Sequence, residues 1–272
     1  MKTYYINLDR SEDRRAWVES TAHRLRIEII RVPAVDGQLI TDGELSDMPD
    51  FVYRHVKRPL TRGEIGCLQS HVKVWQQVAA ADDDWAFVIE DDAHLANGTP
   101  DFLATTEWIP ADADIVKAET NLARQTLSYA VFGNAFGRKV RSLLSDHDGS
   151  AAYFISRKAC LALLADKSAN FAPVDMVLFQ RTGDRYHELN VFQIVPAIAI
   201  QDRLLHADQS LANLSSVIEQ IAHRPGDEKP RGMEKIRKET VRVARQAVDL
   251  ALRFKRLVKR QSITLKIPFR ST

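Results

Sequence analysis

The sequence predicts an α/β protein with a mostly parallel central sheet, because short β-rich runs alternate with segments of helical periodicity. The clearest strand is 85–89 (WAFVI), a nearly continuous apolar run of the kind buried inside a parallel sheet. Residues 65–78 carry apolar side chains at helical spacing. With 272 residues and 45% hydrophobic content, the chain is long enough to bury a substantial core.

The remaining elements follow in order along the chain. Further strands are expected in runs rich in apolar and β-branched residues, over 3–8, 27–32, 115–116, 151–155 and 191–200. Helical patterns lie between these strands, over 11–25 and around 161–164 and 176–179. The segments 41–59 and 121–146 show neither pattern and are expected to be loops.

Composition changes sharply near residue 224. Residues 224–232 hold two prolines and two glycines among charges, so we expect a main domain over 1–223, a linker over 224–232 and a tail over 233–272. The tail shows one apolar stripe at helical spacing, which predicts a basic amphipathic helix. From residue 228 onward there are 14 Lys or Arg and 4 Asp or Glu, whereas residues 1–227 hold 24 and 32. The chain is an acidic body with a basic tail.

This charge division limits the partners of the tail. Nucleic acid is disfavoured, because aromatic residues are almost absent from the tail and the body is acidic. Two interpretations stay open: the helix lies on an anionic membrane surface, or it packs on the protein through its stripe. No secretory signal or run of about 20 apolar residues is visible, so a cytoplasmic protein is expected. Two distant cysteines, Cys67 and Cys160, are too few to indicate a disulfide scaffold or a zinc site, and we expect them to be buried thiols.

The acidic triplet Glu90-Asp91-Asp92 is the sharpest chemical feature. It directly follows the predicted strand 85–89, and ligands of open parallel sheets bind beyond the carboxyl ends of the strands. Three adjacent carboxylates repel one another, and a hard divalent cation such as Mg²⁺ or Mn²⁺ relieves that repulsion and bridges to phosphate oxygens. The alternative is an acidic loop in which one aspartate caps the next helix.

Four ordered blocks give the chain a recognisable pattern: 6–15 (INLDRSEDRR), 60–71 (LTRGEIGCLQSH) with Trp75, 88–93 (VIEDDA), and 149–157 (GSAAYFISR) leading to 173–175 (PVD). The set resembles glycosyltransferase family 25, the bacterial lipopolysaccharide and lipooligosaccharide β-galactosyltransferases that are related to collagen galactosyltransferases. The resemblance spans about residues 3–220. An ordered set of blocks is more specific than any one of them.

The resemblance implies a GT-A-type transferase that inverts the anomeric configuration. It implies transfer of galactose from UDP-galactose onto a saccharide acceptor of lipopolysaccharide or lipooligosaccharide. It implies that Glu90, Asp91 and Asp92 hold Mn²⁺ or Mg²⁺ against the donor diphosphate. It also implies a nucleotide-sugar-binding set, namely Asn7, Asp9, Arg10, Arg15, Ser70 and His71. A lipid-linked acceptor would suit a tail on the cytoplasmic face of the inner membrane.

An inverting transferase needs a carboxylate, separate from the metal site, to deprotonate the acceptor hydroxyl. Asp175, at the expected start of a helix behind Pro173, is the first candidate for this base, and Asp148 is the second. The alternative for Asp175 is a helix cap. The resemblance also implies a late metal ligand, with His206, Gln201 and Asp202 as candidates; the sequence itself does not choose among them, and we take His206 as the first.

Two other functions remain as alternatives. A metal-dependent phosphohydrolase or nucleotidyltransferase would use the same triplet, but it needs clustered ligands for a second metal, and the sequence shows no such cluster. A non-catalytic glycosyltransferase-like binding module is the other alternative, which an intact Glu90-Asp91-Asp92 disfavours.

Overall fold

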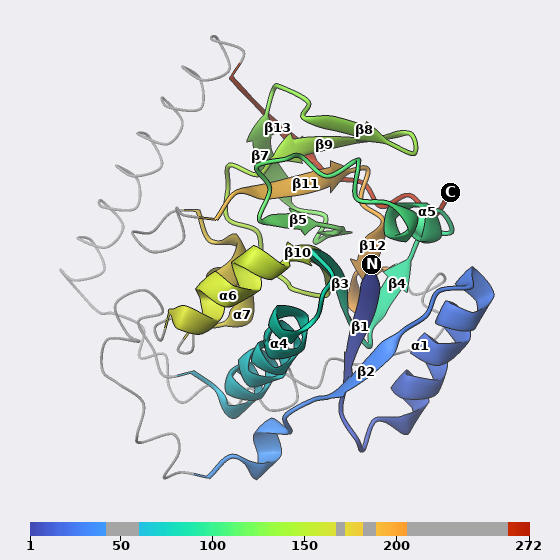
Figure 1. The fold of residues 1–272 in the computed structure, drawn as a ribbon, viewed down its shortest axis with the longest axis vertical. Coiled ribbons are helices and arrows are strands. Elements are labelled where there is room, and N and C mark those ends of the chain that lie inside the picture. The colour runs from blue at the N-terminus through green and yellow to red at the C-terminus, as the bar shows by residue number, and fades with distance from the viewer. Residues whose placement is uncertain (42–59, 167–171, 182–188, 206–260) are drawn as a thin grey trace, which may run out of the picture.

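A mixed eight-stranded sheet forms the centre of the molecule, with helices on both faces (Figure 1). The computed structural model describes residues 1–41, 60–166, 172–181, 189–205 and 261–272. In spatial order the strands are β2 (Ile30–Pro33), β1 (Lys2–Asn7), β3 (Trp85–Glu90), β10 (Ala152–Ser156), β5 (Ile115–Lys117), β11 (Val191–Val195), β9 (Arg138–Ser142) and β8 (Gly133–Ala135). The predicted α/β class is confirmed.

The strand directions show how far this sheet is parallel. β1 pairs in parallel with β2 and β3, and β5 pairs in parallel with β11. β10 lies antiparallel between β3 and β5, and β9 lies antiparallel between β11 and β8. Six of the eight strands therefore point one way, which agrees with the predicted mostly parallel sheet, and two reversed strands are inserted among them.

Helices cover both faces of this sheet. One face carries α4 (Arg62–Ala80), α6 (Arg157–Ala165) and α7 (Val174–Phe179), and the other carries α1 (Glu12–Leu25) and α5 (Thr99–Ala104). Each face of the sheet has its own hydrophobic core, and alternate residues of one strand point into the two cores. On β1, Tyr4 belongs to the core under α4 and Tyr5 to the core under α1. Burial on both faces explains why the central strands read as continuous apolar runs.

Helix α4 is fixed closely against the chain that follows β2. It begins with a capping box, in which Thr61 accepts a hydrogen bond from the Glu64 amide (3.2 Å) and Glu64 accepts one from the Thr61 amide (2.8 Å). At Gly66, a Cβ atom would lie 2.7 Å from the Val35 carbonyl oxygen, so only glycine permits this approach. The Ser70 hydroxyl donates to the Gly66 carbonyl (2.6 Å) and accepts from the Val35 amide (2.8 Å).

A smaller sheet lies beyond the end of β3. It consists of β4 (Ala93–Leu95), β12 (Ala199–Gln201) and β6 (Glu119–Thr120), and it is followed by the short 3-10 helix η4 (Asp202–Leu204). Gln201 pairs with Ala93, and the Asp202 amide donates to the Asp92 carbonyl oxygen at 2.9 Å. The small sheet thereby brings the chain around residue 201 beside the acidic triplet.

The last residues of the chain belong to the body of the protein. β13 (Ser262–Lys266) pairs antiparallel with β7 (Arg124–Ser128), and Ile267 is fully buried in the core. The buried Arg138 side chain donates to the carbonyl oxygens of Ala197 (3.0 Å) and Arg270 (2.8 Å). These contacts connect the chain terminus to β9 and to the segment after β11.

Two sequence predictions need correction here. The expected helical tail over 233–272 is wrong at 262–266, where β-branched residues form a strand instead. The main domain likewise does not consist of 1–223 alone, because β13 and Ile267 complete it. Residues 206–260, with the linker 224–232 and most of the predicted tail, lie outside the described residues.

The other elements compare well with the sequence predictions. Strands were expected at the positions of β1, β2, β3, β5, β10 and β11, and helices at those of α1, α4, α6 and α7. The expected loop over 121–146 is wrong in part, since β7, β8 and β9 lie there. The run RKVRS of β9 is dominated by charges, which hid its extended structure. Among the helices that the structure describes, none has both the length and the apolarity needed to cross a bilayer.

The burial of Ile267 near the C-terminus predicts that shortening its side chain strongly lowers the stability of the protein. Ile267→Ala should lower the free energy of unfolding by about 2–4 kcal/mol, because the side chain is fully buried in the core. Urea titration measures this loss. Ile263→Ala on β13 is the matched control and should cost clearly less, since that side chain is only partly buried. Equal effects of the two changes would contradict the described packing of the terminus.

Candidate functional site

The acidic triplet leaves the centre of the main sheet and is buried. β3 ends at Glu90, and Asp91 and Asp92 are only 6% and 5% exposed. The parallel pairing of β1 with β3 places Ile6 opposite Glu90. Asn7, the next residue, therefore lies beside Asp91, and its Nδ2 donates to Asp91 Oδ2 at 2.7 Å.

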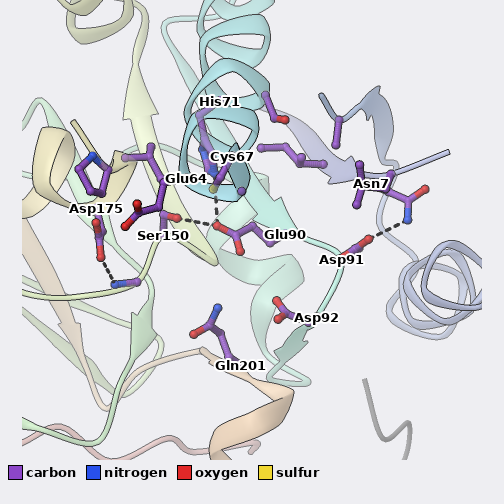
Figure 2. Close-up of a pocket in the computed structure, with 18 of the residues that line it drawn as sticks. Asn7, Glu64, Cys67, His71, Glu90, Asp91, Asp92, Ser150, Asp175 and Gln201 are labelled. Atoms are coloured by element: carbon purple, nitrogen blue, oxygen red, sulfur yellow. Dashed lines mark hydrogen bonds and ion pairs between the residues drawn. The ribbon is translucent and has the colours of Figure 1, made fainter. Parts of the chain in front are cut away.

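The three carboxylates point in different directions (Figure 2). Glu90 faces α4, where its Oε1 lies 3.3 Å from Nε2 of His71. The same oxygen accepts a hydrogen bond from Ser150 Oγ (2.5 Å), which comes from the segment before β10. Asp91 turns towards Asn7, and Asp92 turns towards Gln201. The strand ends at Glu90 and the chain turns at Asp91 and Asp92 before β4, so the three neighbouring side chains do not share one direction.

Arg14, on the first turns of α1, neutralises part of this charge. Its Nη1 lies 3.0 Å from Asp91 Oδ1 and its Nη2 lies 3.2 Å from Asp92 Oδ2. The side chain is only 14% exposed, so the two ion pairs are shielded from water. A single guanidinium thus bridges two carboxylates, as its forked geometry allows.

The triplet nevertheless keeps an excess of buried negative charge. Burial, together with the charges of Glu90 and Asp91, raises the pKa of Asp92 to about 7. Burial also raises the pKa of Asp91, and Arg14 and Asn7 oppose that shift. Burial would raise the pKa of Glu90, but hydrogen bonds from His71 and Ser150 outweigh the effect of burial, and the pKa of Glu90 is lowered. Among the described residues, Asp92 Oδ1 is buried with no hydrogen-bond partner, so it is the atom best placed to accept a cation.

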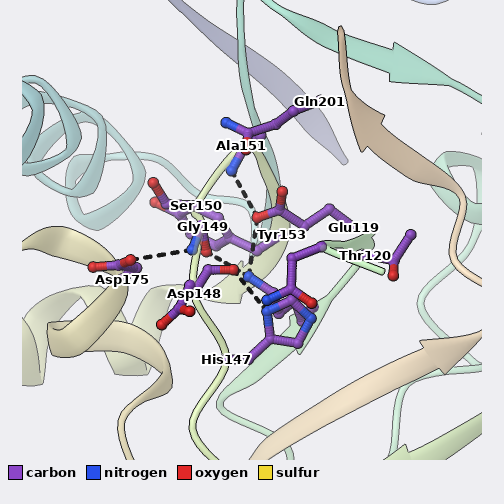
Figure 3. A network of polar contacts seen from close by, with 12 residues as sticks. Glu119, Thr120, His147, Asp148, Gly149, Ser150, Ala151, Tyr153, Asp175 and Gln201 are labelled. Carbon is purple, nitrogen blue, oxygen red and sulfur yellow. Dashed lines mark hydrogen bonds and ion pairs between the residues drawn. The ribbon is translucent and has the colours of Figure 1, made fainter. Parts of the chain in front are cut away.

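A buried ion pair that includes Glu119 lies beside the segment 148–151 (Figure 3). Lys117, at the end of β5, is fully buried, and its Nζ donates to Glu119 Oε1 (2.9 Å) and to the Gly149 carbonyl (2.5 Å). The same ammonium lies 3.6 Å from the centroid of the Phe179 ring. Burial lowers the pKa of Lys117 and raises that of Glu119, and each charge opposes the shift of the other.

This ion pair fixes the segment 149–151. Gly149 has φ +89°, a conformation that favours glycine, and its amide donates to Asp175 Oδ2 at 3.1 Å. The Ala151 amide donates to Glu119 Oε1 at 2.8 Å. Between them, the Ser150 hydroxyl reaches Glu90. The segment is therefore held on one side by the buried pair and in turn contacts both the triplet and Asp175.

Asp175 lies in the first turn of α7, and Pro173 occupies the N-cap position. The interpretation of Asp175 as the cap residue is therefore wrong, although its Oδ1 does accept from the Met176 amide at 2.8 Å. Burial raises the pKa of Asp175, opposed by the Gly149 hydrogen bond and by the Lys117 charge. A buried carboxylate of raised pKa beside a cavity is suited to accept a proton.

These groups meet at a cavity of about 300 Å³. It is lined by most of the side chains that the sequence selected, namely Asn7, Ser70, His71, Glu90, Asp91, Asp92, Asp148 and Asp175. Asp175 and the triplet thus face one space from two sides (Figure 2). The individual roles of these residues stay predictions.

Other predicted residues are placed elsewhere. Asp9 and Arg10 are exposed and form ion pairs with Arg31 (2.6 Å) and Asp36 (2.7 Å). They do not line the cavity, and neither does Arg15. These positions flank the start of α1, where side chains turn to the surface. His206 lies outside the described residues, and Gln201, which the sequence left as an alternative, lines the cavity.

Several residues of the site were missed by sequence reasoning. Arg14 could have been found, because the buried positions Val18, Ala22 and Leu25 of α1 continue back to residue 14 on one helix face. Cys67 and His71 could also have been paired, since they lie one helical turn apart. Lys117 and Glu119 gave no signal of their own, because charged residues in a short apolar run look like an exposed strand end.

Comparison with known proteins identifies the family of this chain. The chain belongs to glycosyltransferase family 25, because the model of that family, described as "Glycosyltransferase family 25 (LPS biosynthesis protein)", matches residues 1–178. The protein is therefore a glycosyltransferase, and the family suggested by the four sequence blocks is confirmed.

Individual relatives show how the similarity is distributed. Lacto-N-neotetraose biosynthesis glycosyltransferase LgtB of Neisseria meningitidis is 31% identical over 233 residues, which cover 80% of this chain and 81% of that protein. Lipooligosaccharide biosynthesis protein lic2B of Haemophilus influenzae is 28% identical over 57% of this chain and 60% of that protein. Procollagen galactosyltransferase 2 of Mus musculus is 39% identical over 97 residues, or 34% of this chain and 16% of that protein.

The raised pKa of Asp92 predicts that Asp92→Asn increases the thermal stability of the protein, and that this increase depends on pH. The folded protein holds the Asp92 proton more tightly than the unfolded chain, so its contribution to stability is lost as pH rises through about 7. Asn carries no charge, and the Tm of Asp92→Asn should exceed that of the wild type by more at pH 8 than at pH 5. Thermal melts at both values measure this difference. Asp101→Asn, on the exposed start of α5, is the control and should show no such trend. A constant difference would contradict the buried charge.

Proposed function

We propose that the protein is an inverting, metal-dependent galactosyltransferase of GT-A type. It transfers galactose from UDP-galactose to a lipid-linked saccharide acceptor of lipopolysaccharide or lipooligosaccharide. The relatives include a procollagen galactosyltransferase, whose name supports galactose as the transferred sugar. They also include two proteins of oligosaccharide biosynthesis, whose names support a saccharide as the acceptor. The observation that carries the proposal is one cavity lined by aspartates from two separate places in the fold, the buried Asp91 and Asp92 after β3 and Asp175 on α7.

The residues present suit a hard divalent cation. Asp92 would hold Mn²⁺ or Mg²⁺ through its unpartnered Oδ1, with Gln201 as a further oxygen donor. Asp91 would join as the neighbouring ligand when Arg14 releases its Oδ1. Glu90 is engaged with Ser150 and His71, so we assign it to positioning. When bound, the cation would stabilise the charge that develops on the leaving diphosphate.

Arg14 would change partners as donor binds. In the structure its guanidinium balances Asp91 and Asp92, which is the charge that a cation would otherwise supply. Once a cation balances the two carboxylates, the Arg14 guanidinium is free to bind a diphosphate oxygen. Arg14 thus takes the phosphate-binding role that the sequence had given to Arg10 and Arg15.

Asp175 is the proposed base. Its carboxylate accepts one N–H on each oxygen, from Gly149 and Met176, which fixes its plane and leaves a lone pair on each oxygen. Burial strengthens it as a base, while the Lys117 charge keeps it ionised. Asp175 would take the proton of the acceptor hydroxyl as that oxygen attacks the anomeric carbon. The runner-up, Asp148, is exposed and lacks this support.

The basic tail is proposed to hold the protein on an anionic membrane surface. Each Lys or Arg near such a surface contributes about 1 kcal/mol, and residues 228–272 carry a net charge of about +10. Truncation at residue 227 would also remove β13, so the cleaner change replaces Lys and Arg within 229–260 by Gln. The altered protein should no longer sediment with vesicles of anionic lipid, and unchanged sedimentation would contradict the proposal.

The base assignment predicts a selective kinetic loss. Asp175→Asn should lower kcat by about 10²–10⁴-fold, because it removes a positioned general base. The KM for donor should change little, since the donor diphosphate binds at the triplet. Steady-state kinetics with UDP-galactose measure both constants. Asp148→Asn is the control and should retain most of the activity. A large loss in Asp148→Asn with little loss in Asp175→Asn would reverse the assignment.

The metal assignment predicts that chelation stops transfer and that Mn²⁺ or Mg²⁺ restores it. A panel of UDP- and GDP-sugars, with and without Mn²⁺, should show a thermal shift and nucleotide release for UDP-galactose only when metal is present. In Asp91→Ala/Asp92→Ala both responses should disappear. No response to any donor would favour the non-catalytic binding module, and nucleotide cleavage without sugar transfer to a saccharide would favour the phosphohydrolase.

A further inference from the structure

A second group of possible metal ligands lies on the α4 side of the cavity. Cys67 and His71 are one turn apart on α4, and Glu90 comes from the end of β3. One ligand atom from each residue, a sulfur, a nitrogen and an oxygen, lies within 4.8 Å of the other two. All three side chains line the cavity (Figure 2). Asp91 and Asp92 point elsewhere, so this group is separate from the proposed oxygen site.

His71 is held in the orientation that a metal ligand requires. Its ring is fully buried, and Nδ1 is engaged at 2.8 Å with the Tyr153 hydroxyl, which itself accepts from Trp75 Nε1 at 3.1 Å. Nε2 is thereby directed at Glu90. Histidine ligands of metals ordinarily have their second nitrogen fixed in this way by a hydrogen-bond partner.

The spacing of the ligand atoms suits a small tetrahedral ion. Two ligands at zinc distances of about 2.0–2.1 Å, separated by a tetrahedral angle, lie about 3.3 Å apart. His71 Nε2 and Glu90 Oε1 are separated by 3.3 Å. The sulfur should lie about 3.6 Å from each of them around zinc. Since Cys67 Sγ is already within 4.8 Å of both, a rotation of its side chain can complete the site.

The chemistry of the three ligands selects the ion. Thiolate and imidazole favour Zn²⁺, whereas Mg²⁺ and Mn²⁺ prefer oxygen ligands. Three protein ligands leave a fourth tetrahedral position, as in zinc sites that remain open to a water molecule or a substrate. Here that position would face the cavity, because all three residues line it.

We propose that Cys67, His71 and Glu90 form a binding site for Zn²⁺, distinct from the Asp91/Asp92 site, and that its occupation inhibits sugar transfer. On binding, the Cys67 thiol releases its proton to solvent, and the His71 ring takes the tautomer that is protonated on Nδ1, where the Tyr153 oxygen accepts the N–H. The sulfur and Nε2 then coordinate the ion, with no change of oxidation state. Inhibition follows because the ion takes Glu90 away from Ser150 and occupies part of the cavity. This second statement rests on the proposed function, whereas the binding itself does not.

Direct binding tests the site without any sugar transfer. Co²⁺, a spectroscopic substitute for Zn²⁺, should give the metal-free full-length protein a thiolate-to-cobalt absorption band that one equivalent of Zn²⁺ abolishes. Cys67→Ser should lack the band and bind Zn²⁺ more than about tenfold more weakly by calorimetry, as expected when a ligand is lost. Cys160→Ser is the matched control, because Cys160 is the only other cysteine and is fully buried in the core. It should keep the band.

A second measurement does not depend on any variant folding correctly. In the wild type, a small thiol reagent should modify Cys67, which is partly exposed, before Cys160, and Zn²⁺ should slow that modification. Zn²⁺ without effect on this rate, or a cobalt band that persists in a folded Cys67→Ser protein, would overturn the proposed site.

The activity arm separates this inference from the proposed function. Transfer in the presence of Mn²⁺ should fall when Zn²⁺ is added, and each variant is compared with its own rate without Zn²⁺. Asp92→Asn should lose transfer but keep the cobalt band, so a failure of the oxygen site does not count against the sulfur site. Zn²⁺ binding with unaltered transfer would overturn the inhibitory role alone.

Discussion

Buried negative charge is the constraint on which the site depends. Glu90, Asp91, Asp92, Glu119 and Asp175 are all wholly or largely removed from water around one cavity, and burial acts to raise the pKa of each. Two cations oppose this cost: Arg14 from α1 and Lys117 from β5. Isolated buried carboxylates would take up protons instead of remaining charged. The fold therefore has to bring a helix and a distant strand to the same place, and the central sheet does so.

The pairing of β1 with β3 is the step that makes this possible. Because the two strands are parallel neighbours, both end at the same edge, and Asn7 meets Asp91 there. α1 begins immediately after β1, so its first turns bring Arg14 to the triplet. The inserted antiparallel β10 begins at that edge next to β3, and the segment before it carries Ser150 to Glu90. Local chain direction, more than sequence proximity, decides which groups meet.

The difference between local patterns and long-range pairing explains how much of the fold and of the site the sequence could predict. Continuous apolar runs and helical stripes identified the central strands and the four main helices, because burial on one or two faces leaves a periodic trace. The triplet and Asp175 were also found, since polar residues directly after buried elements stand out. Pairing partners left no such trace. The Lys117–Glu119 pair joins residues two apart but matters through Gly149, and the contribution of β13 depends on contacts across more than a hundred residues.

The same constraint links the two proposed cation sites. A cavity with more carboxylates than basic groups attracts any divalent ion, so selectivity has to come from the ligand atoms rather than from charge. On the Asp91/Asp92 side all donors are oxygens, whereas on the α4 side Glu90 faces a sulfur and a nitrogen. Glu90 lies between these sides and is already held by Ser150 and His71. Hydrogen bonds from these two residues lower its pKa, so the carboxylate next to both sides of the cavity is set by its neighbours on the α4 side.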